Sequence, residues 1–459
     1  MENINSYLNL DNNWIKIKDW WNNIIIDEDI FPKSFNKIKK ENKDIFNNKL
    51  LNYIIELFNS DLDKLYNIKI NDEFINSIKF NTEIFNLLFE NDKELENIIS
   101  YILRYKKYFK KIKNKIIEIV YPLFNDIYFN KLLIKDDDLS PLFLIILLVN
   151  YLYIINRNIK KTIKLFLELD PIGINFVIIS YSILDNYMDS LNNELSNDFI
   201  NNKNIFMKWF NDIVLNPSEK IFLNEEQQKI DQCIIFKKYY ELFINKYPVD
   251  KYKFLYDYNK IMIYTLNKAN YIQKNKDISE ELIMEYSFKK SFMSFFFIIL
   301  ITNIHLKLKI NNDDMLVVSK SLFLIQLLDD YMDIDKDIYE NNNTYFTLNN
   351  NFDNKAKKII ISLFLFIKEL NIKNKNVTNL LNYSIKNIIL LLYFYHYNKF
   401  EENNIKDYFE EYSLLSINIL KYFNKNSYNF YNNNLIINMI KKNLNNLYYY
   451  NISEKFIKY

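Results

Sequence analysis

The sequence predicts an all-α protein, and three observations support that fold class. The chain of 459 residues contains one Gly and six Pro, whereas β-rich domains need glycine at turns with positive φ. Forty-nine per cent of the residues are hydrophobic and 17% are aromatic, which is too apolar for a disordered chain. Apolar residues recur at three- and four-residue spacing, for example in 49–58 and 95–119. This periodicity is typical of amphipathic helices.

The predicted helices have recognisable start signals or a helical periodicity. Ser140 is expected to cap a helix that begins at Pro141, and this helix or helix pair extends to about Leu169. Asp170 and Pro171 repeat the same signal, with Gly173 just inside the next helix. Further helices are expected at 203–214, 225–246, 249–274, 278–308, 313–337, 355–370, 377–399, 405–423 and 435–448.

Charge and residue counts exclude several functions. The chain has 59 Lys and Arg, 57 Asp and Glu and a net charge of +2, so we expect no nucleic-acid partner, since such proteins carry a basic excess. One Cys and two His, at 305 and 396, exclude thiolate clusters and multi-His metal sites. A single glycine excludes phosphate-binding glycine-rich loops. Any phosphate or metal chemistry must therefore use carboxylates.

The apolar segments predict a cytoplasmic protein with no transmembrane segment. The first residues are polar and acidic, unlike a signal peptide. The longest apolar runs, 141–155 and 292–302, are shorter than the ~20 residues that span a bilayer. Cys233 has no charged or histidine neighbour in sequence and is expected to be inert. A lone cysteine fits a reducing compartment.

A first acidic cluster ends the helix that starts at Pro171. Residues 172–184 contain no charge, and Asp185, Asn186 and Asp189 follow. At 100° per residue they fall at about 0°, 100° and 40° around the helix. An otherwise apolar helix is thus predicted to carry one narrow stripe of oxygen ligands.

A second cluster with a matching layout lies 144 residues later. It follows the uncharged stretch 321–328 and contains Asp329, Asp330, Asp333 and Asp337. These fall at about 0°, 100°, 40° and 80°, whereas Asp335 falls at about 240° and lies off the stripe.

Carboxylates one turn apart on an apolar helix repel each other, and burial adds a desolvation cost. A bound divalent cation offsets both effects, and Mg²⁺ prefers carboxylate, phosphate and water oxygens. Two stripes that face each other across a bundle would hold Mg²⁺ and a diphosphate between them. The alternative is that each cluster is a solvated helix end.

Two Asp-rich motifs at this separation resemble those of the class I isoprenoid synthase superfamily. The segment 326–333, QLLDDYMD, is similar to the second motif of trans-prenyl diphosphate synthases. The segment 327–337, LLDDYMDIDKD, also resembles the second motif of tetraprenyl-β-curcumene synthase-like terpene synthases, with Asp329, Asp333 and Asp337 as the matching acids. Leu184, Asp185, Asn186 and Asp189 match the first motif of that family.

The sequence also departs from these families. Ser182 stands where the terpene synthase family has a leading aspartate. Prenyl diphosphate synthases have an arginine pair after the first motif, and this chain has 190–193, SLNN, instead. Arginine occurs only at 104 and 157. These departures favour ionisation of one diphosphate over coupling of two.

The resemblance implies a class I isoprenoid synthase-like helical bundle with extra N-terminal helices. About 100 N-terminal residues have no counterpart in the smaller family members, so the expected division is an N-terminal helical extension at 1–98 and a helical domain at 99–459. The implied function is a terpene synthase, a lyase that ionises a prenyl diphosphate with Mg²⁺. The alternatives are a trans-prenyl diphosphate or squalene/phytoene-type synthase, and a catalytically inactive helical protein.

The same resemblance implies the site residues. Asp185, Asp189, Asp329 and Asp333 would be catalytic. The metal ligands would be Asp185, Asn186, Asp189, Asp329, Asp330, Asp333 and Asp337. A lysine should contact the diphosphate, and Lys289, Lys290 and Lys320 are the candidates near the second motif.

Overall fold

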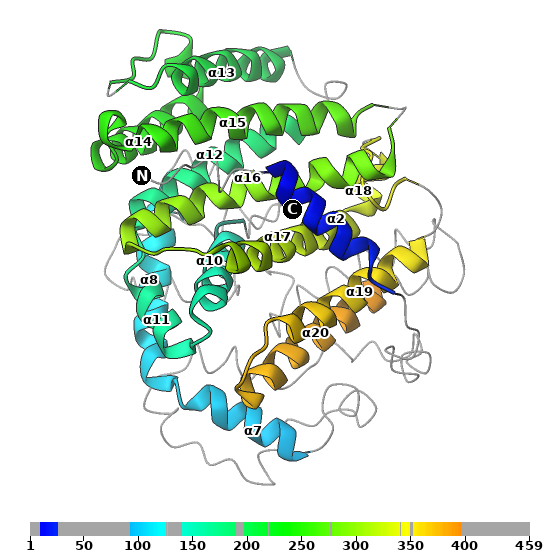
Figure 1. Ribbon diagram of the computed structural model, residues 1–459. Helices are drawn as coiled ribbons and strands as arrows, with labels where there is room; N and C mark the ends of the chain where they lie inside the picture. The colour runs from blue at the N-terminus through cyan, green and yellow to red at the C-terminus, as the bar shows by residue number, and fades with distance from the viewer. Residues whose placement is uncertain are drawn as a thin grey trace, which may run out of the picture. The chain divides into compact units, whose positions relative to one another are not determined.

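The computed structural model describes residues 10–25, 92–124, 126, 140–189, 197–218, 220–275, 278–339, 341–348 and 352–395 (Figure 1). All regular structure in these ranges is helical, which confirms the all-α class. The helices predicted at 49–58, 405–423 and 435–448 lie outside the described residues, as does His396.

The chain divides into two compact units. Unit 1 comprises residues 1–23 and 118–352, and unit 2 comprises residues 24–117 and 353–459. In unit 2, α7 (Asp92–Leu103) packs against α20 (Lys375–Tyr395). Unit 2 also contains nearly all of α19 (Phe352–Glu369) and the first part of α8 (Lys106–Phe124). The predicted division at residue 98 stays a prediction.

Unit 1 holds both acidic clusters. Its helices are α2 (Leu10–Asn22), α10 (Ser140–Asn156), α11 (Ile159–Leu167), α12 (Pro171–Asp189), α13 (Asn197–Leu215), α14 (Asp231–Lys246), α15 (Val249–Gln273), α16 (Glu280–Leu306), α17 (Asn312–Met332) and α18 (Ile334–Tyr339). A short 3₁₀ turn at Gln227–Lys229 precedes α14.

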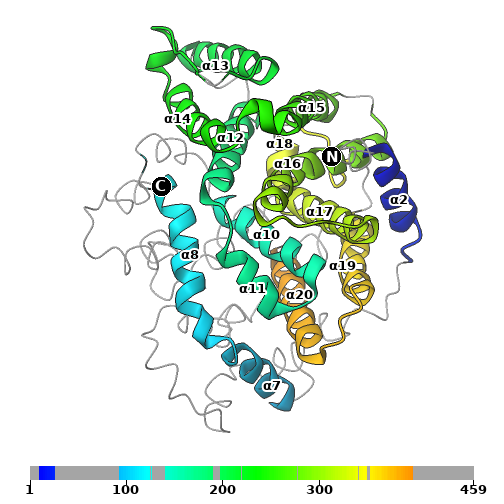
Figure 2. The same ribbon diagram turned by 60° about the vertical axis from the view of Figure 1, so that its left-hand side comes forward.

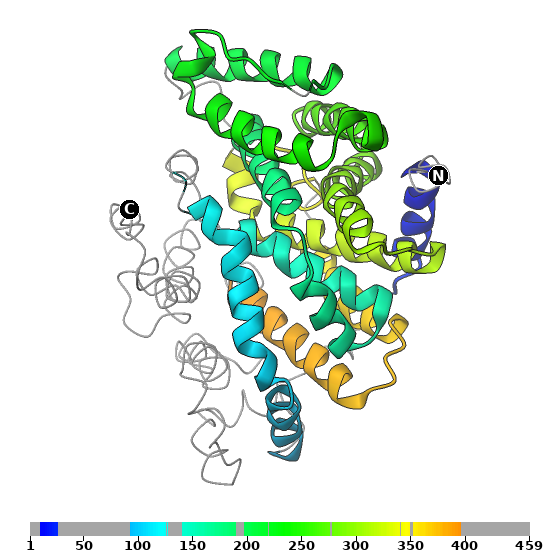
Figure 3. The same cartoon turned by 90° about the vertical axis from the view of Figure 1, so that its left-hand side faces the viewer.

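Helix α16 is the central element of unit 1. It packs against α2, α10, α12, α15 and α17, and Figure 2 shows it between α15 and α17. Figure 3 shows α12 and α2 on opposite sides of it. Its 27 residues have a mean hydropathy of 1.3 over the most apolar window, enough by length and composition to cross a membrane, yet 72% of that window is buried. This degree of burial is typical of the core helix of a bundle.

Four of the predicted helical stretches are divided by a local break, and one of them is 225–246, where Ile230 separates the 3₁₀ turn from α14. The stretch from Ser140 to Leu169 is a helix pair, because Arg157 has φ of 49° and the side chain of Asn158 caps the second helix. The stretch 95–119 is interrupted between α7 and α8. The stretch 313–337 is interrupted at Asp333, the C-cap of α17.

The predicted start signal at Asp170 is confirmed. Its Oδ1 accepts a hydrogen bond from the backbone N–H of Ile172 at 3.1 Å, and its Oδ2 accepts one from Gly173 at 3.1 Å. The same carboxylate accepts hydrogen bonds from Lys246 Nζ and Tyr247 Oη, each at 2.6 Å. One buried side chain thus caps α12 and ties it to the end of α14.

Helix α2 packs directly on the helix that carries the second acidic cluster. The ring of Trp21 lies 5.4 Å from that of Phe323 on α17 and 5.8 Å from that of Tyr345. Trp14 stacks on Phe288 of α16 at 5.9 Å. Residues 10–23 therefore belong to the same compact unit as α16 and α17.

Candidate functional site

The second acidic cluster occupies the junction of α17 and α18. Asp329 is exposed and Asp333 is half-buried. The backbone N–H of Asp333 donates to the carbonyl of Asp329 at 3.0 Å, so the two residues lie one helical turn apart. Two neighbouring carboxylates, each at least partly accessible, could share a divalent cation.

Asp337 lies one turn further along and is more enclosed. Its backbone N–H donates to the carbonyl of Asp333 at 2.8 Å. Its side chain is buried, and its Oδ1 accepts a hydrogen bond from Asn342 Nδ2 at 3.4 Å. This contact holds Asp337 against the residues that follow α18.

Asp330 points into the protein and is only 4% exposed. Burial raises the pKa of its carboxyl to about 6, although the hydrogen bond from Gln326 and the positive charge of Lys290 both favour the ionised form. Gln326 Nε2 donates to its Oδ1 at 2.9 Å. This enclosure favours a packing role for Asp330 over a role as metal ligand.

The first cluster lies in the last turn of α12, which ends at Asp189. The backbone of Asp185, Asn186 and Asp189 is helical, and their side chains lie outside the described residues.

Both clusters lie at the same end of unit 1, because α12 and α17 run in the same direction against α16. On α12, Gly173 faces Ile301, and Phe176, one turn later, contacts Phe297. This order makes α12 antiparallel to α16.

Helix α17 is also antiparallel to α16. Ser291 Oγ contacts the carbonyl of Leu322 at 3.5 Å, while Phe288, earlier on α16, lies 6.3 Å from the ring of Phe323. The positive charge of Lys290, in the first half of α16, acts to lower the pKa of Asp330 near the end of α17. Figure 1 shows α12 and α17 running the same way and α16 running back between them.

A residue count compares the two clusters along α16. Thirteen residues separate Phe176 from Asp189, and seven separate Leu322 from Asp329. For parallel helix axes, counting back by these numbers from Phe297 and Ser291 reaches Met284 in both cases.

The three candidate lysines differ in their contacts. Lys289 Nζ lies 2.7 Å from Asp11 Oδ1 and 2.6 Å from Glu285 Oε1, so its charge is already matched. Lys320 is buried with its Nζ 4.8 Å from the ring centre of Trp20. Lys290 is half-buried, and its charge acts on Asp330 in the second cluster. Lys290 is therefore the candidate whose charge is seen to act on the second cluster.

Other singled-out residues have structural contacts. Arg157 forms an ion pair with Asp314 at 3.3 Å. His305 is an exposed residue near the end of α16, and its Nε2 lies 3.0 Å from the carbonyl oxygen of Glu168. Cys233 is fully buried, and burial raises the pKa of its thiol to about 12, which agrees with the expected inertness.

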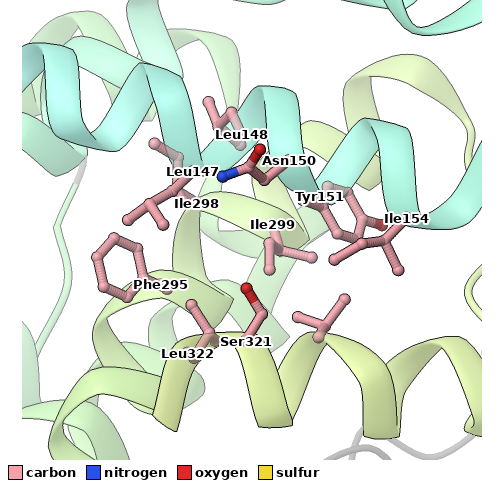
Figure 4. Close-up of a pocket in the computed structure, with 11 residues that line it drawn as sticks. Leu147, Leu148, Asn150, Tyr151, Ile154, Phe295, Ile298, Ile299, Ser321 and Leu322 are labelled. Carbon is pink, nitrogen blue, oxygen red and sulfur yellow. The ribbon is translucent and has the colours of Figure 1, made fainter. Parts of the chain in front are cut away.

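A small apolar cleft with a cavity volume of about 20 Å³ lies between α10, α16 and α17 (Figure 4). Leu147 and Tyr151 come from α10, Phe295 and Ile299 from α16, and Leu322 from α17. Leu322 precedes Asp329 by seven residues, which is about 10 Å along the helix. The cleft therefore begins about two turns from the second cluster.

The structure describes the side chains of the predicted metal ligands on α17 and α18. Among the side chains that the structure describes, no three His, Cys, Asp or Glu residues lie close enough together to hold a metal ion. The predicted site draws on both helices, and its half on α12 lies outside those side chains. The accessible oxygens of Asp329 and Asp333 fit a hard cation chemically.

Sequence reasoning did not separate Asp329 from Asp330, and it did not choose among the lysines. Both distinctions depend on packing in the folded unit, which buries Asp330 and pairs Lys289 with Asp11 of α2. Comparison of the chain with protein-family models, with curated proteins and with solved structures gives no match.

Proposed function

We propose that this protein is a class I terpene synthase that ionises a prenyl diphosphate and converts the allylic carbocation to a terpene. One observation carries the proposal. Two charged clusters, each after an uncharged stretch, end two helices that run in the same direction against α16. A substrate diphosphate at that end of unit 1 would meet carboxylates from both helices.

In this proposal the two helices divide the ligands between them. Asp185 and Asp189 at the end of α12 and Asp329 and Asp333 at the end of α17 would hold Mg²⁺. When bound, Mg²⁺ neutralises the charge that develops on the leaving diphosphate. Asp330 would support the end of α17 from inside, where Gln326 holds its carboxylate.

The remaining groups supply charge and an apolar environment. Lys290, on the α16 face next to Asp330, would contribute positive charge near the diphosphate. The hydrocarbon chain would extend toward the cleft between α10, α16 and α17, which would have to widen to accept it. The aromatic rings of Tyr151 and Phe295 line that cleft, and aromatic faces attract cations. Exclusion of water there would protect the carbocation.

The experiment is incubation of the full chain with geranyl, farnesyl and geranylgeranyl diphosphate and Mg²⁺, with and without isopentenyl diphosphate. Products are extracted and identified by mass spectrometry. A hydrocarbon or alcohol formed from one diphosphate alone supports a terpene synthase. A longer diphosphate that requires isopentenyl diphosphate assigns chain elongation instead, and coupling of two identical diphosphates assigns the squalene/phytoene type.

Adjacent residues provide a matched pair of variants. Asp329→Asn is expected to lower turnover by about a hundredfold, because it removes an accessible carboxylate. Asp330→Asn has the same chemistry one position later, but Asp330 is buried and is not accessible to a bound cation. It is expected to retain most activity. No turnover and no Mg²⁺-dependent diphosphate binding would overturn the proposal in favour of an inactive helical protein.

A further inference from the structure

Helix α15 presents an exposed face with an unusual composition. Its outward residues are Lys253, Lys260, Ile261, Tyr264, Lys268, Tyr271 and Lys274, called here the α15 strip. At 100° per residue they fall within an arc of about 140° and extend along the helix for about 30 Å. The same arc also contains Asp257 and the exposed Asn267, so the strip is a mainly tyrosine, isoleucine and lysine surface.

The apolar members of the strip are accessible to solvent. Tyr271 is 73% exposed, Tyr264 is 67% exposed and Ile261 is 42% exposed. The opposite face of the helix is already used, since residues such as Tyr258 and Leu266 are buried in unit 1. Packing within the unit therefore does not account for the aromatic and aliphatic residues of the strip.

The charge of the strip is predominantly positive. Asp257 is the acidic residue on this arc, and it pairs with Lys253 at 2.7 Å and with Lys260 at 3.9 Å. Lys268 and Lys274 are exposed further along, and Lys268 Nζ lies 5.2 Å from the ring centre of Tyr286. Four lysines and one aspartate give the strip a local excess of positive charge, whereas the whole chain has a net charge of only +2.

We propose that the α15 strip binds the surface of a bilayer that contains anionic phospholipid. Tyrosine rings and lysine side chains, with an apolar body and a polar end, suit the boundary between headgroups and acyl chains. Lysines near an anionic surface add electrostatic attraction. A helix held by its opposite face would lie parallel to the membrane without crossing it.

This inference does not depend on the proposed enzymatic function. It rests on the exposure and charge of α15, which lies between α13 and α16 in unit 1 (Figure 1). The positive charge selects an anionic surface, and the exposed tyrosines and isoleucine favour a lipid interface over a nucleic acid. The chain as a whole lacks the basic excess of nucleic-acid binders.

The test is sedimentation of the full chain with phosphatidylcholine vesicles, with and without about one third phosphatidylserine. We expect binding that requires phosphatidylserine and weakens as salt is added. Lys268→Glu with Lys274→Glu should weaken it at least about tenfold. Tyr264→Ser with Tyr271→Ser should weaken it without changing its salt dependence.

A matched control reverses two charges elsewhere in unit 1. Lys160→Glu with Lys164→Glu changes two exposed lysines on α11 and should leave vesicle binding within about twofold of the parent. Circular dichroism of each variant confirms that the fold is retained. An environment-sensitive dye on Tyr271→Cys should shift to the blue with vesicles, and one on Lys160→Cys should not. The buried Cys233 will not compete for the label.

Three results would overturn the inference. The first is absence of vesicle binding at low salt. The second is binding that the α15 variants leave unchanged. The third is a parent protein that does not bind vesicles but dimerises or binds nucleic acid, and whose α15 variants lose that property. Loss of dimerisation would assign the strip to a second copy of the chain, and loss of nucleic-acid binding would assign it to a nucleic acid.

Discussion

Gly173, the single glycine of the chain, lies directly against Ile301 in the contact between α12 and α16. A Cβ at position 173 would lie 2.5 Å from Ile301 Cγ2 and 3.1 Å from Asp170 Oδ2. A side chain at this position would require Ile301 or one of the two helices to shift. The close contact of α12 with α16 at this level therefore depends on glycine.

We predict that Gly173→Ala destabilises the fold by about 1–3 kcal/mol, because the added methyl group overpacks the contact. Chemical denaturation monitored by circular dichroism measures the effect. Ile301→Ala removes the methyl group that would clash, so Gly173→Ala should cost less in that background. An equal cost in both backgrounds would assign the effect to something other than this contact.

A second prediction concerns acid stability through Asp170. Burial raises the pKa of this carboxyl, but hydrogen bonds from Lys246 and Tyr247 outweigh burial, and the pKa lies below its ordinary value. The stability it contributes is therefore present above about pH 4 and is lost as pH falls through its lower folded-state pKa. Asp170→Asn should cost about 2–4 kcal/mol at neutral pH.

The difference between parent and Asp170→Asn should narrow as the solution is acidified below about pH 4. Denaturation midpoints measured across that range test this. Asp257→Asn is the control, because its ion pair with Lys253 is exposed and should contribute less than about 1 kcal/mol. If the stability difference between the parent and Asp170→Asn stays constant on acidification, the ionised Asp170 carboxylate is not its source.

Substitution of Trp21 tests whether α2 stabilises unit 1, which carries the second cluster. The side chain is 2% exposed and packs on Phe323 and Tyr345. Trp21→Ala is expected to cost about 3–5 kcal/mol. Ile15→Ala on the outer face of the same helix, where the side chain is 54% exposed, should have little effect. Comparable losses for the two variants would place α2 outside the core.

Cys233 should resist thiol reagents in the native protein. Its side chain is fully buried, and burial raises the pKa of the thiol to about 12, so the reactive thiolate is scarce. Reaction with a chromogenic disulfide should be negligible in buffer and complete in urea. Rapid modification under native conditions would show that α14 opens locally.

Much of the local structure was predictable because its signals are local. The aspartate–proline pair at 170–171 marks the start of α12, and the capping hydrogen bonds confirm it. The break at Arg157 was harder to predict from the sequence, because arginine is not a residue type that marks a positive φ, and its φ is 49°. The cap at Asn158 marks the break more clearly.

The candidate site was predictable as a pattern of residues but not as a set of environments. Asp329 and Asp330 are neighbours of the same residue type, yet one is exposed and the other is buried, a difference that only the folded structure shows. The same limit applies to Lys289, whose partner Asp11 lies 278 residues away. The α15 strip could not be predicted from the sequence, because tyrosine and isoleucine are residue types that usually indicate a buried core.

The burial of α16 has a consequence for synthesis on the ribosome. Helices α2, α10, α12 and α15 precede it in the chain, and α17 follows it. At about 5–20 residues per second, the end of α17 leaves the ribosome about one to five seconds after the end of α16. During that interval the side of α16 that α17 will cover is open to targeting factors and chaperones. Emergence of α17 ends the exposure of this long apolar helix.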